Sequence, residues 1–261
     1  MPRRTRPVSC LAQLGSEATP PQLETYTKRS ALQGTLEMRA VPKINGQWGM
    51  LGNYHSGDCA LAAAGHAVKV WAAPQAANPP VQTAALSRAY TALKRAAHAR
   101  AAANPTDPDA GGITANDTLN YWRTEGVAGH RIDAYAALSP DSRGDPKWVR
   151  FAISAFGCAY VVFELPNAVV RKGMTPENAP AWTTVTPGPT GEPNPRNGHC
   201  VIYVAYDAHL NLSAVTWGEV RPVSWEFHQQ YCDEMYVGLD PSWAVPAGVN
   251  LDKWRQAFAE H

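Results

Sequence analysis

Residues 52–66, GNYHSGDCALAAAGH, change character at Cys59. The residues before the cysteine are small, polar or turn-forming, and those after it begin an apolar run. That run predicts a helix over residues 59–71 with little polar surface, buried along most of its length. The cysteine therefore stands at the N-terminus of a buried helix, for which Ser56 or Asp58 is the expected cap.

A cysteine in this position lies against unpaired backbone N–H groups and the positive end of the helix dipole. Both favour the thiolate, and with a cationic partner nearby such placement lowers a cysteine pKa from about 8.5 to between roughly 3.5 and 7.5. This is the environment of a nucleophile. The alternative interpretation of Cys59 is a small core residue at a helix start.

Composition limits the other possibilities. The chain has 261 residues, enough for one large domain or two small ones with a real core. Its 23 Lys and Arg against 22 Asp and Glu leave a net charge of +1, so the overall charge calls for neither nucleic acid nor membrane. No apolar run approaches a membrane span or a secretory signal, and a cytoplasmic protein is expected. Five scattered cysteines do not resemble a disulfide framework.

The periodicity of the chain changes near its middle, from helical patterns to strands. Helices are predicted at residues 59–71, 83–104, 118–126 (capped by Asn116 or Asp117), 145–156, 225–231 and 251–261. Strands are predicted at residues 130–138, 158–165, 199–206, 210–217 and 234–239, of which the third and fourth form a hairpin. The long loop at residues 166–198 is rich in Pro, Gly, Asn and Thr, and loops of this length usually touch a functional site or are loosely ordered.

A cysteine nucleophile needs a base, and position sorts the eight histidines. His66 lies about 10 Å along the helix axis from Cys59, too far to hold the thiol, and is more simply a buried histidine bonded to a second element. His55 lies on the preceding loop and would need a sharp reversal. His199 stands at the first position of a strand, where its ring is held at the end of the long loop. A cysteine and a histidine from distant parts of the chain meet only through the fold, which is how such pairs are commonly built.

These residues resemble the motifs of the papain-like cysteine peptidases. In that family a Gln stands six residues before the nucleophilic Cys, and here Asn53 stands six residues before Cys59. The family histidine follows the cysteine by about 130 to 150 residues, an interval that contains His199. The histidine strand of the family ends in Gly-Tyr, where this chain has Ala205 and Tyr206.

The next strand of the family ends in Asn-Ser-Trp-Gly, and the sequence VTWG falls at the same distance from the histidine. Trp217 and Gly218 match, but Val215 replaces the Asn that orients the histidine. His199 therefore needs another acceptor. Thr216 is adjacent, but strand alternation predicts that it points to the opposite face unless the strand is twisted or bulged. Thr216 stays a candidate acceptor, and Glu219 is the other one nearby. A backbone carbonyl, or no third residue at all with packing under Trp217, is the alternative.

The resemblance covers roughly residues 49–239 and implies an α+β, papain-like fold. In such a fold an N-terminal helical half carries the cysteine helix and packs on a mostly antiparallel sheet that carries the histidine. The motifs also look like those of a bacterial and phage group of the same superfamily with no settled function, so the substrate is not inherited. The expected parts are a flexible or extended arm (1–35), a catalytic domain (36–240, with a helical half at about 50–126 and a β half at about 127–240) and a C-terminal helix packed on it (241–261).

The resemblance also implies a reaction. Cys59 would attack an amide carbonyl, the Cys59 N–H and the Asn53 amide would hold the oxyanion, and His199 would protonate the leaving amine. The residues expected to bind substrate or to shield the histidine are Trp217, Gly57 and Asp58. The implied partner is a peptide or amide substrate, with no cofactor and no metal. Hydrolysis and acyl transfer are not distinguished, and the oligomeric state is left open.

Two other classes of function stay open. The replacement at Val215 fits a papain-fold binding or scaffold protein that has kept the shape without the chemistry. A metal site could draw nitrogen and sulfur ligands from Cys59, His55, His66 and His199, but close-spaced ligand pairs typical of structural zinc sites are missing. Thiol reactivity separates the enzyme from the scaffold, and bound zinc would identify the metal protein.

Overall fold

The computed structural model describes residues 20–44, 46–53, 57–74, 81–103, 113–170 and 180–259. Its helices are α1 (Cys59–Ala72), α2 (Thr83–Ala103), α3 (Ala115–Thr124), α4 (Pro140–Arg143), α5 (Pro146–Phe156), α6 (Trp225–Tyr231) and α7 (Leu251–Ala259). Its strands are β1 (Ala134–Ala137), β2 (Ala159–Glu164), β3 (Gly198–Tyr206), β4 (Leu212–Thr216), β5 (Glu219–Val223) and β6 (Cys232–Leu239). Short 3-10 helices are η1 (Leu23–Thr25), η2 (Arg29–Gly34), η4 (Pro189–Gly191) and η5 (Pro195–Asn197).

The strands form one six-stranded sheet in the order β1-β6-β2-β3-β4-β5, and every neighbouring pair is antiparallel. The predicted α+β class with an antiparallel sheet is confirmed. Strand β5 was not predicted, because its sequence contains Pro222 and lacks apolar alternation. It forms the edge of the sheet beside β4, where a proline is tolerated because one side of the strand needs no ladder partner.

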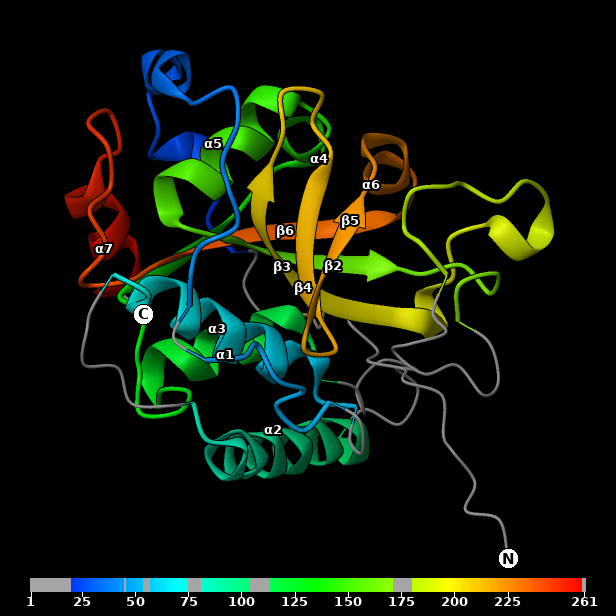
Figure 1. Cartoon of the computed structure of the whole chain (residues 1–261). Helices are drawn as coiled ribbons and strands as arrows, with labels where there is room; N and C mark the ends of the chain where they lie inside the picture. Colours follow the sequence, from blue (N-terminus) through cyan, green and yellow to red (C-terminus); the bar gives the residue numbers. More distant parts are fainter. Residues whose placement is uncertain are drawn as a thin grey trace, which may run out of the picture.

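Helices cover both faces of the sheet. Figure 1 shows α1, α2 and α3 on one face and α4, α5 and α6 on the other. Helix α1 is buried along nearly all its length, as its uniformly apolar sequence predicts. Trp71 near its end donates a hydrogen bond from Nε1 to the carbonyl of Phe156, at 2.7 Å. This bond ties the helical layer to the end of α5.

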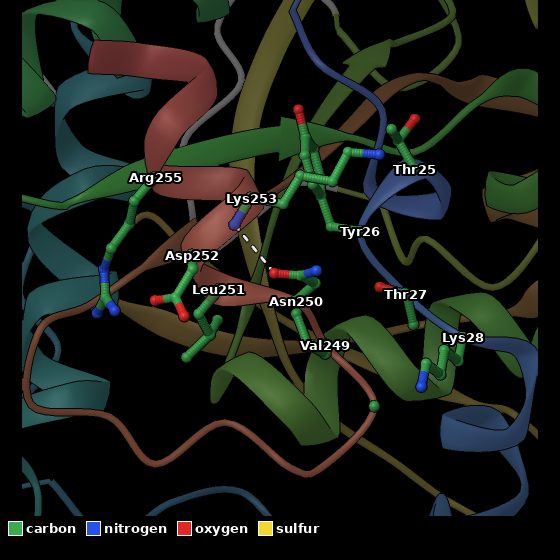
Figure 2. A pocket seen from close by; sticks show the side chains of 11 residues that line it. Thr25, Tyr26, Thr27, Lys28, Val249, Asn250, Leu251, Asp252, Lys253 and Arg255 are labelled. Carbon is green, nitrogen blue, oxygen red and sulfur yellow. Dashed lines mark hydrogen bonds between the residues drawn. The ribbon is translucent and has the colours of Figure 1, made fainter.

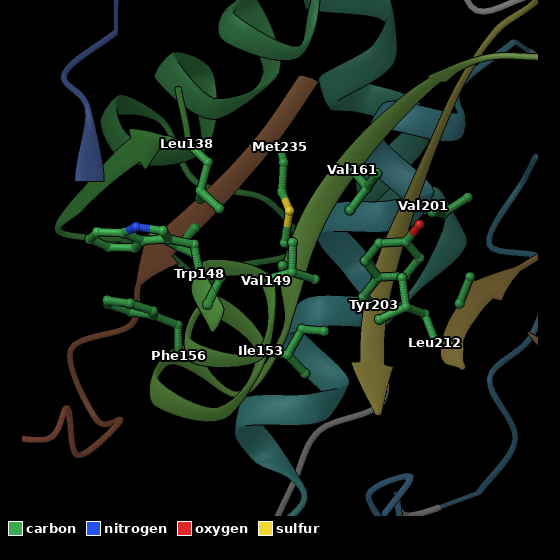
Figure 3. Close-up of a cluster of buried hydrophobic side chains, with 14 of the residues drawn as sticks. Leu138, Trp148, Val149, Ile153, Phe156, Val161, Val201, Tyr203, Leu212 and Met235 are labelled. Carbon is green, nitrogen blue, oxygen red and sulfur yellow. The ribbon is translucent and has the colours of Figure 1, made fainter. Parts of the chain in front are cut away.

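Helix α5 packs its apolar face on the other side of the sheet. The predicted start is confirmed: Asp145 accepts a hydrogen bond from the Lys147 amide at 2.8 Å, and Pro146 occupies the first turn. Figure 3 shows side chains of this core lying between the helix and the strands. Its labelled members are Leu138, Trp148, Val149, Ile153, Phe156, Val161, Val201, Tyr203, Leu212 and Met235.

Helix α3 begins earlier than predicted. Its N-cap is Thr114, whose hydroxyl accepts from the Asp117 amide while the Asp117 carboxylate accepts from the Thr114 amide, both at 3.0 Å. This reciprocal pair is a capping box. The prediction of Asn116 or Asp117 as the cap was wrong, because Asp117 is the third residue of the helix and caps it from inside.

Helix α2 carries a narrow apolar face and a basic solvated one. Its buried residues are Leu86, Ala89, Leu93 and Ala97. In the ranges that the structure describes, no helix combines the length and apolar character needed to cross a membrane.

The ends of the described chain pack against each other. The predicted arm lies outside the described residues up to residue 19, and the chain after that point runs over the body, with Leu23 fully buried. Trp254 of α7 stacks on Tyr26 with ring centroids 5.6 Å apart, and its Nε1 donates to the carbonyl of Tyr135 at 3.0 Å. The boundaries of the arm, the catalytic domain and the C-terminal segment stay predictions.

Candidate active site

Cys59 is the first residue of α1, and its side chain is fully buried. Asp58 occupies the N-cap position but its side chain makes no capping hydrogen bond, so that expectation was wrong. The cause is its backbone, with φ −106° and ψ 26°, which differs from the extended conformation that lets a cap side chain reach back to the helix. Ser56, the other expected cap, lies outside the described residues. The Asp58 carboxylate instead lies 2.7 Å from where a Cβ on Gly52 would stand.

The Cys59 sulfur lies beside the strand that carries His199. The backbone amide of Cys200 donates a hydrogen bond to Sγ of Cys59, with a nitrogen–sulfur distance of 3.3 Å. Strand amides point within the plane of the sheet, so the sulfur is placed next to β3 at the residue that follows the histidine. The start of α1 is held there by Tyr160 of β2, whose hydroxyl donates to the carbonyl of Ala60 at 3.0 Å. The fold thus brings together α1, which carries Cys59, and β3, which carries His199.

His199 is 1% exposed and lies near the start of β3. Its Nε2 is 2.7 Å from Oγ1 of Thr216. The expectation that Thr216 points away from the histidine was wrong, and strand register explains why. Val215 pairs with Ile202, so Thr216 lies one step further, beside the residue two places after His199. Residues two apart on a strand share a face, so Thr216 is on the histidine side and Val215 is on the other.

Two tryptophans enclose the imidazole. Trp217, the expected shield, stacks on His199 with ring centroids 4.9 Å apart and planes at 29°. Trp182 meets the same ring edge-on, at 5.9 Å and 87°, and is 1% exposed. The sequence did not identify Trp182, although the loop at residues 166–198 that contains it was expected to touch a site or to be loosely ordered. Together the rings restrict rotation of His199 and exclude water from it.

Trp217 and Gly218 form a two-residue turn between β4 and β5, because Thr216 pairs with Glu219. Both turn residues have positive φ, 50° and 79°, as tight hairpin turns require. The guanidinium of Arg221 lies 5.2 Å from the centroid of the Trp217 ring, within range of a cation–π contact. The turn therefore fixes the tryptophan over the histidine.

Asn53 is 3% exposed and ends a second turn, in which its backbone N–H donates to the carbonyl of Met50 at 3.0 Å. Leu51 and Gly52, between them, have φ of 52° and 97°. This turn follows Gly49, which forms a β-bridge with Gly218 of the first turn. The turn that ends at Asn53, the expected oxyanion residue, therefore lies next to the turn of Trp217 and Gly218. Gly57 is half-buried and precedes Asp58.

Among the described cysteines, no other one is the first residue of a helix. No disulfide joins cysteines in the part of the chain that the structure describes, and Cys10 lies outside it. Burial raises the pKa of Cys158 and of Cys232 to about 12 in each case. Nor do three His, Cys, Asp or Glu side chains among the described residues come together as a possible metal site. His55, one of the suggested ligands, is not described, and the metal alternative has no observation behind it.

A pocket of about 640 Å³ lies elsewhere, between the start of the described chain and α7. Figure 2 shows Thr27 and Asn250 facing each other across it. Its lining residues are Thr25, Tyr26, Thr27, Lys28, Gly248, Val249, Asn250, Leu251, Asp252, Lys253 and Arg255. None of the predicted site residues is among them.

A helix that begins with a cysteine and packs beside a histidine strand of an antiparallel sheet is the arrangement of the papain-like cysteine protease fold, and the chain has this fold. It is similar to xylellain, a cysteine protease from Xylella fastidiosa, with a TM-score of 0.60 and 12% identity over 92% of this chain and 98% of that one. It is also similar to procathepsin B S9 from Trypanosoma congolense, with a TM-score of 0.50 and 10% identity over 88% of this chain and 85% of that one. No protein-family model and no curated protein sequence matches the chain.

Proposed function

We propose that the chain is a thiol-dependent peptidase, amidase or acyl transferase in which Cys59 is the nucleophile and His199 the general acid and base. The hydrogen bond from the Cys200 amide to the Cys59 sulfur carries this proposal, because the sulfur contacts the residue that directly follows His199 on β3. The bond between His199 and Thr216 supports it, since a catalytic imidazole needs an orienting partner. We also propose that the substrate is a peptide or another amide and that the protein is cytoplasmic.

The reaction would follow from these positions. Nε2 of His199 bonds to Thr216, so Nδ1 is the nitrogen that exchanges a proton with the thiol and the substrate. The Cys59 thiolate attacks the carbonyl carbon, and the new oxyanion accepts hydrogen bonds from the Cys59 backbone N–H and the Asn53 amide. Imidazolium Nδ1–H then protonates the leaving nitrogen as the carbon–nitrogen bond breaks. Water or a second amine loses a proton to Nδ1, attacks the thioester and releases the acyl group.

The enclosure of His199 supports this role for its ring. An imidazole free to rotate would lose the productive position, and the stacked Trp217 together with the edge-on Trp182 prevents that rotation. The same rings keep water from the bond to Thr216, which strengthens it. Packing and a hydroxyl thus take the place of the family's orienting Asn.

A second candidate is a binding or scaffold protein of the same fold. Cys59 is 0% exposed and His199 is 1% exposed, so in this conformation a substrate does not reach the sulfur. A protein that never opens would keep these contacts for stability alone. Chemical competence of the thiol decides between the two candidates.

The deciding experiment uses p-nitrophenyl acetate, which acylates nucleophilic thiols and releases a coloured product. We expect a burst of p-nitrophenolate equal to the protein concentration and an acetyl group on the Cys59 peptide by mass spectrometry. Cys59→Ala and His199→Ala should abolish the burst. Cys200→Ala is the matched control, because it removes a neighbouring buried thiol and keeps the amide that contacts Cys59. Acetylation elsewhere, or no burst in folded protein, would favour the scaffold.

A further inference from the structure

Two side chains of α1 hold the backbone that leads to Asn53. Nε2 of His66 is 2.9 Å from the carbonyl oxygen of Gly49, and because a carbonyl only accepts, the imidazole is the donor. Nζ of Lys69 donates to the carbonyls of Gln47 and Trp48, each at 2.7 Å. His66 and Lys69 are three residues apart and so lie on one side of the helix. Three consecutive carbonyls are therefore bound by one helix face.

These three carbonyls belong to residues 47–53, called here the 47–53 segment, which makes close contacts on two sides. Gly49 bridges to Gly218, and a Cβ on Gly218 would lie only 2.9 Å from the carbonyl carbon of Gly49. A Cβ on Gly65 of α1 would lie 2.9 Å from a methyl group of Leu51. The segment is therefore in close contact with α1 on one side and with the Trp217 turn on the other.

His66 is built for a neutral, structural hydrogen bond. It is 2% exposed, and its ring and that of Trp48 pack in a T-shaped arrangement, with centroids 6.0 Å apart. Burial, followed by the nearby Lys69 charge, lowers its pKa to about 4, while the bonds to the Gly49 and Trp48 carbonyls act in the opposite direction. At neutral pH the ring is thus uncharged and keeps one N–H for the Gly49 carbonyl.

We propose that His66 and Lys69 are positioning residues for the reaction: they hold the 47–53 segment so that Asn53 keeps its place relative to Cys59. This inference rests on the proposed function. His66 itself does not meet the reacting atoms, since seven residues of helix separate it from Cys59 by about 10 Å. Its effect passes through the Gly49 carbonyl and the turn that ends at Asn53. One helix would thereby supply the nucleophile and set the position of the oxyanion donor.

The activity test uses the p-nitrophenyl acetate burst. His66→Phe keeps a ring but removes the donor, and we expect the acylation rate constant to fall about tenfold to a hundredfold, because small displacements of a catalytic group are costly. The dissociation constant of the ester, taken from the concentration dependence of the burst rate, and the alkylation rate of Cys59 should stay within about twofold, since neither depends on Asn53. His66→Gln, which restores a donor, should recover most of the rate. In an Asn53→Ala background, His66→Phe should change the rate less than about twofold.

A readout independent of catalysis is hydrogen exchange of the amides in the 47–53 segment. His66→Phe and Lys69→Met should each increase that exchange. The matched control is His228→Phe, which removes an equally buried histidine that donates to the Arg143 carbonyl at 2.8 Å, and it should leave both the exchange of the segment and the burst unchanged.

The outcomes separate the two claims. A burst that survives Cys59→Ala would overturn the proposed function, and with it the catalytic part of this inference. Where the burst does depend on Cys59, unchanged exchange in His66→Phe, an unchanged acylation rate, or an undiminished effect in the Asn53→Ala background would overturn the positioning role alone.

Discussion

The hydroxyl oxygen of Thr216 lies 2.7 Å from Nε2 of His199. In the papain-like peptidases that the sequence resembles, an Asn at the position of residue 215 would make this contact. Val215 instead faces the core beneath α1, with Cys59, Cys200 and Ile202. The residue that we propose orients the histidine is therefore shifted by one place along β4. A one-residue difference of this kind exchanges the two faces of a strand.

Replacement of Thr216 tests this assignment. Thr216→Val keeps the shape and removes the hydroxyl, and we expect kcat to fall about tenfold to a hundredfold, since hydrogen bonds to groups that become charged contribute about 1.5 to 3 kcal/mol. Thr216→Ser should keep most of the activity. Val215→Asn places an amide on the wrong face, so adding it to Thr216→Val should not restore kcat. Recovery in that double variant would show that the register assigned to β4 is wrong.

Gly218 should be intolerant of a side chain. Its φ is +79°, and a Cβ would meet the carbonyl carbon of Gly49 at 2.9 Å, so Gly218→Ala combines backbone strain with a backbone clash. We expect a loss of roughly 2 to 4 kcal/mol in the free energy of unfolding. Gly129→Ala is the control, because Gly129 has φ +81° with no atom within 4 Å of the added Cβ, and it should cost only about 1 kcal/mol. Urea unfolding measures both, and equal losses would mean that the Gly49 contact is unimportant.

Acid should weaken the fold through its buried histidines. Burial is the main cause that lowers the pKa of His66 and of His228 to about 4 in each case, against 6.5 when exposed. Between these values the unfolded chain binds more protons than the native one, so stability rises with pH and is lost as pH falls from 6.5 towards 4. Each histidine should cost about 2 kcal/mol between pH 7 and pH 5. Urea titrations should show a smaller pH dependence for His228→Phe than for the unaltered chain.

Glu234 should act in the opposite direction. Burial, with a contribution from Asp233, raises its pKa to about 7, against 4.5 when exposed. Stability from the protonated form is present below pH 4.5 and is lost as pH rises through 7, because the native chain then holds a proton that the unfolded chain releases. Glu234→Gln should therefore raise the free energy of unfolding at pH 8 by up to about 3 kcal/mol and change it little at pH 4. A gain of the same size at both pH values would contradict the assigned pKa.

Local patterns in the sequence predicted the elements that position the site. The junction at Cys59 marked the start of a buried helix, and the strand that begins with His199 was clear from its apolar run. These features depend on neighbouring residues alone, which is why they could be read without a fold.

Features that depend on contacts between distant segments of the chain could not be predicted from local patterns. The side of β4 occupied by Thr216 follows from its register with β3, and the contact of Trp182 with His199 joins a loop to a strand. In each case a distant or adjoining segment overrides the local preference.

The measurement that tests the central claim most directly is the order in which the cysteines react with iodoacetamide at pH 7, followed by peptide mapping. Cys59 is 0% exposed, whereas Cys232 is partly exposed and has its pKa raised to about 12 by burial of the thiol. If access alone governs the reaction, Cys232 is labelled first. We predict instead that Cys59 is labelled well before Cys232 and before the equally buried Cys158 and Cys200, and that His199→Ala removes this advantage. Labelling of Cys232 ahead of Cys59 in the folded protein, unchanged by His199→Ala, would contradict the account of Cys59 as a nucleophile.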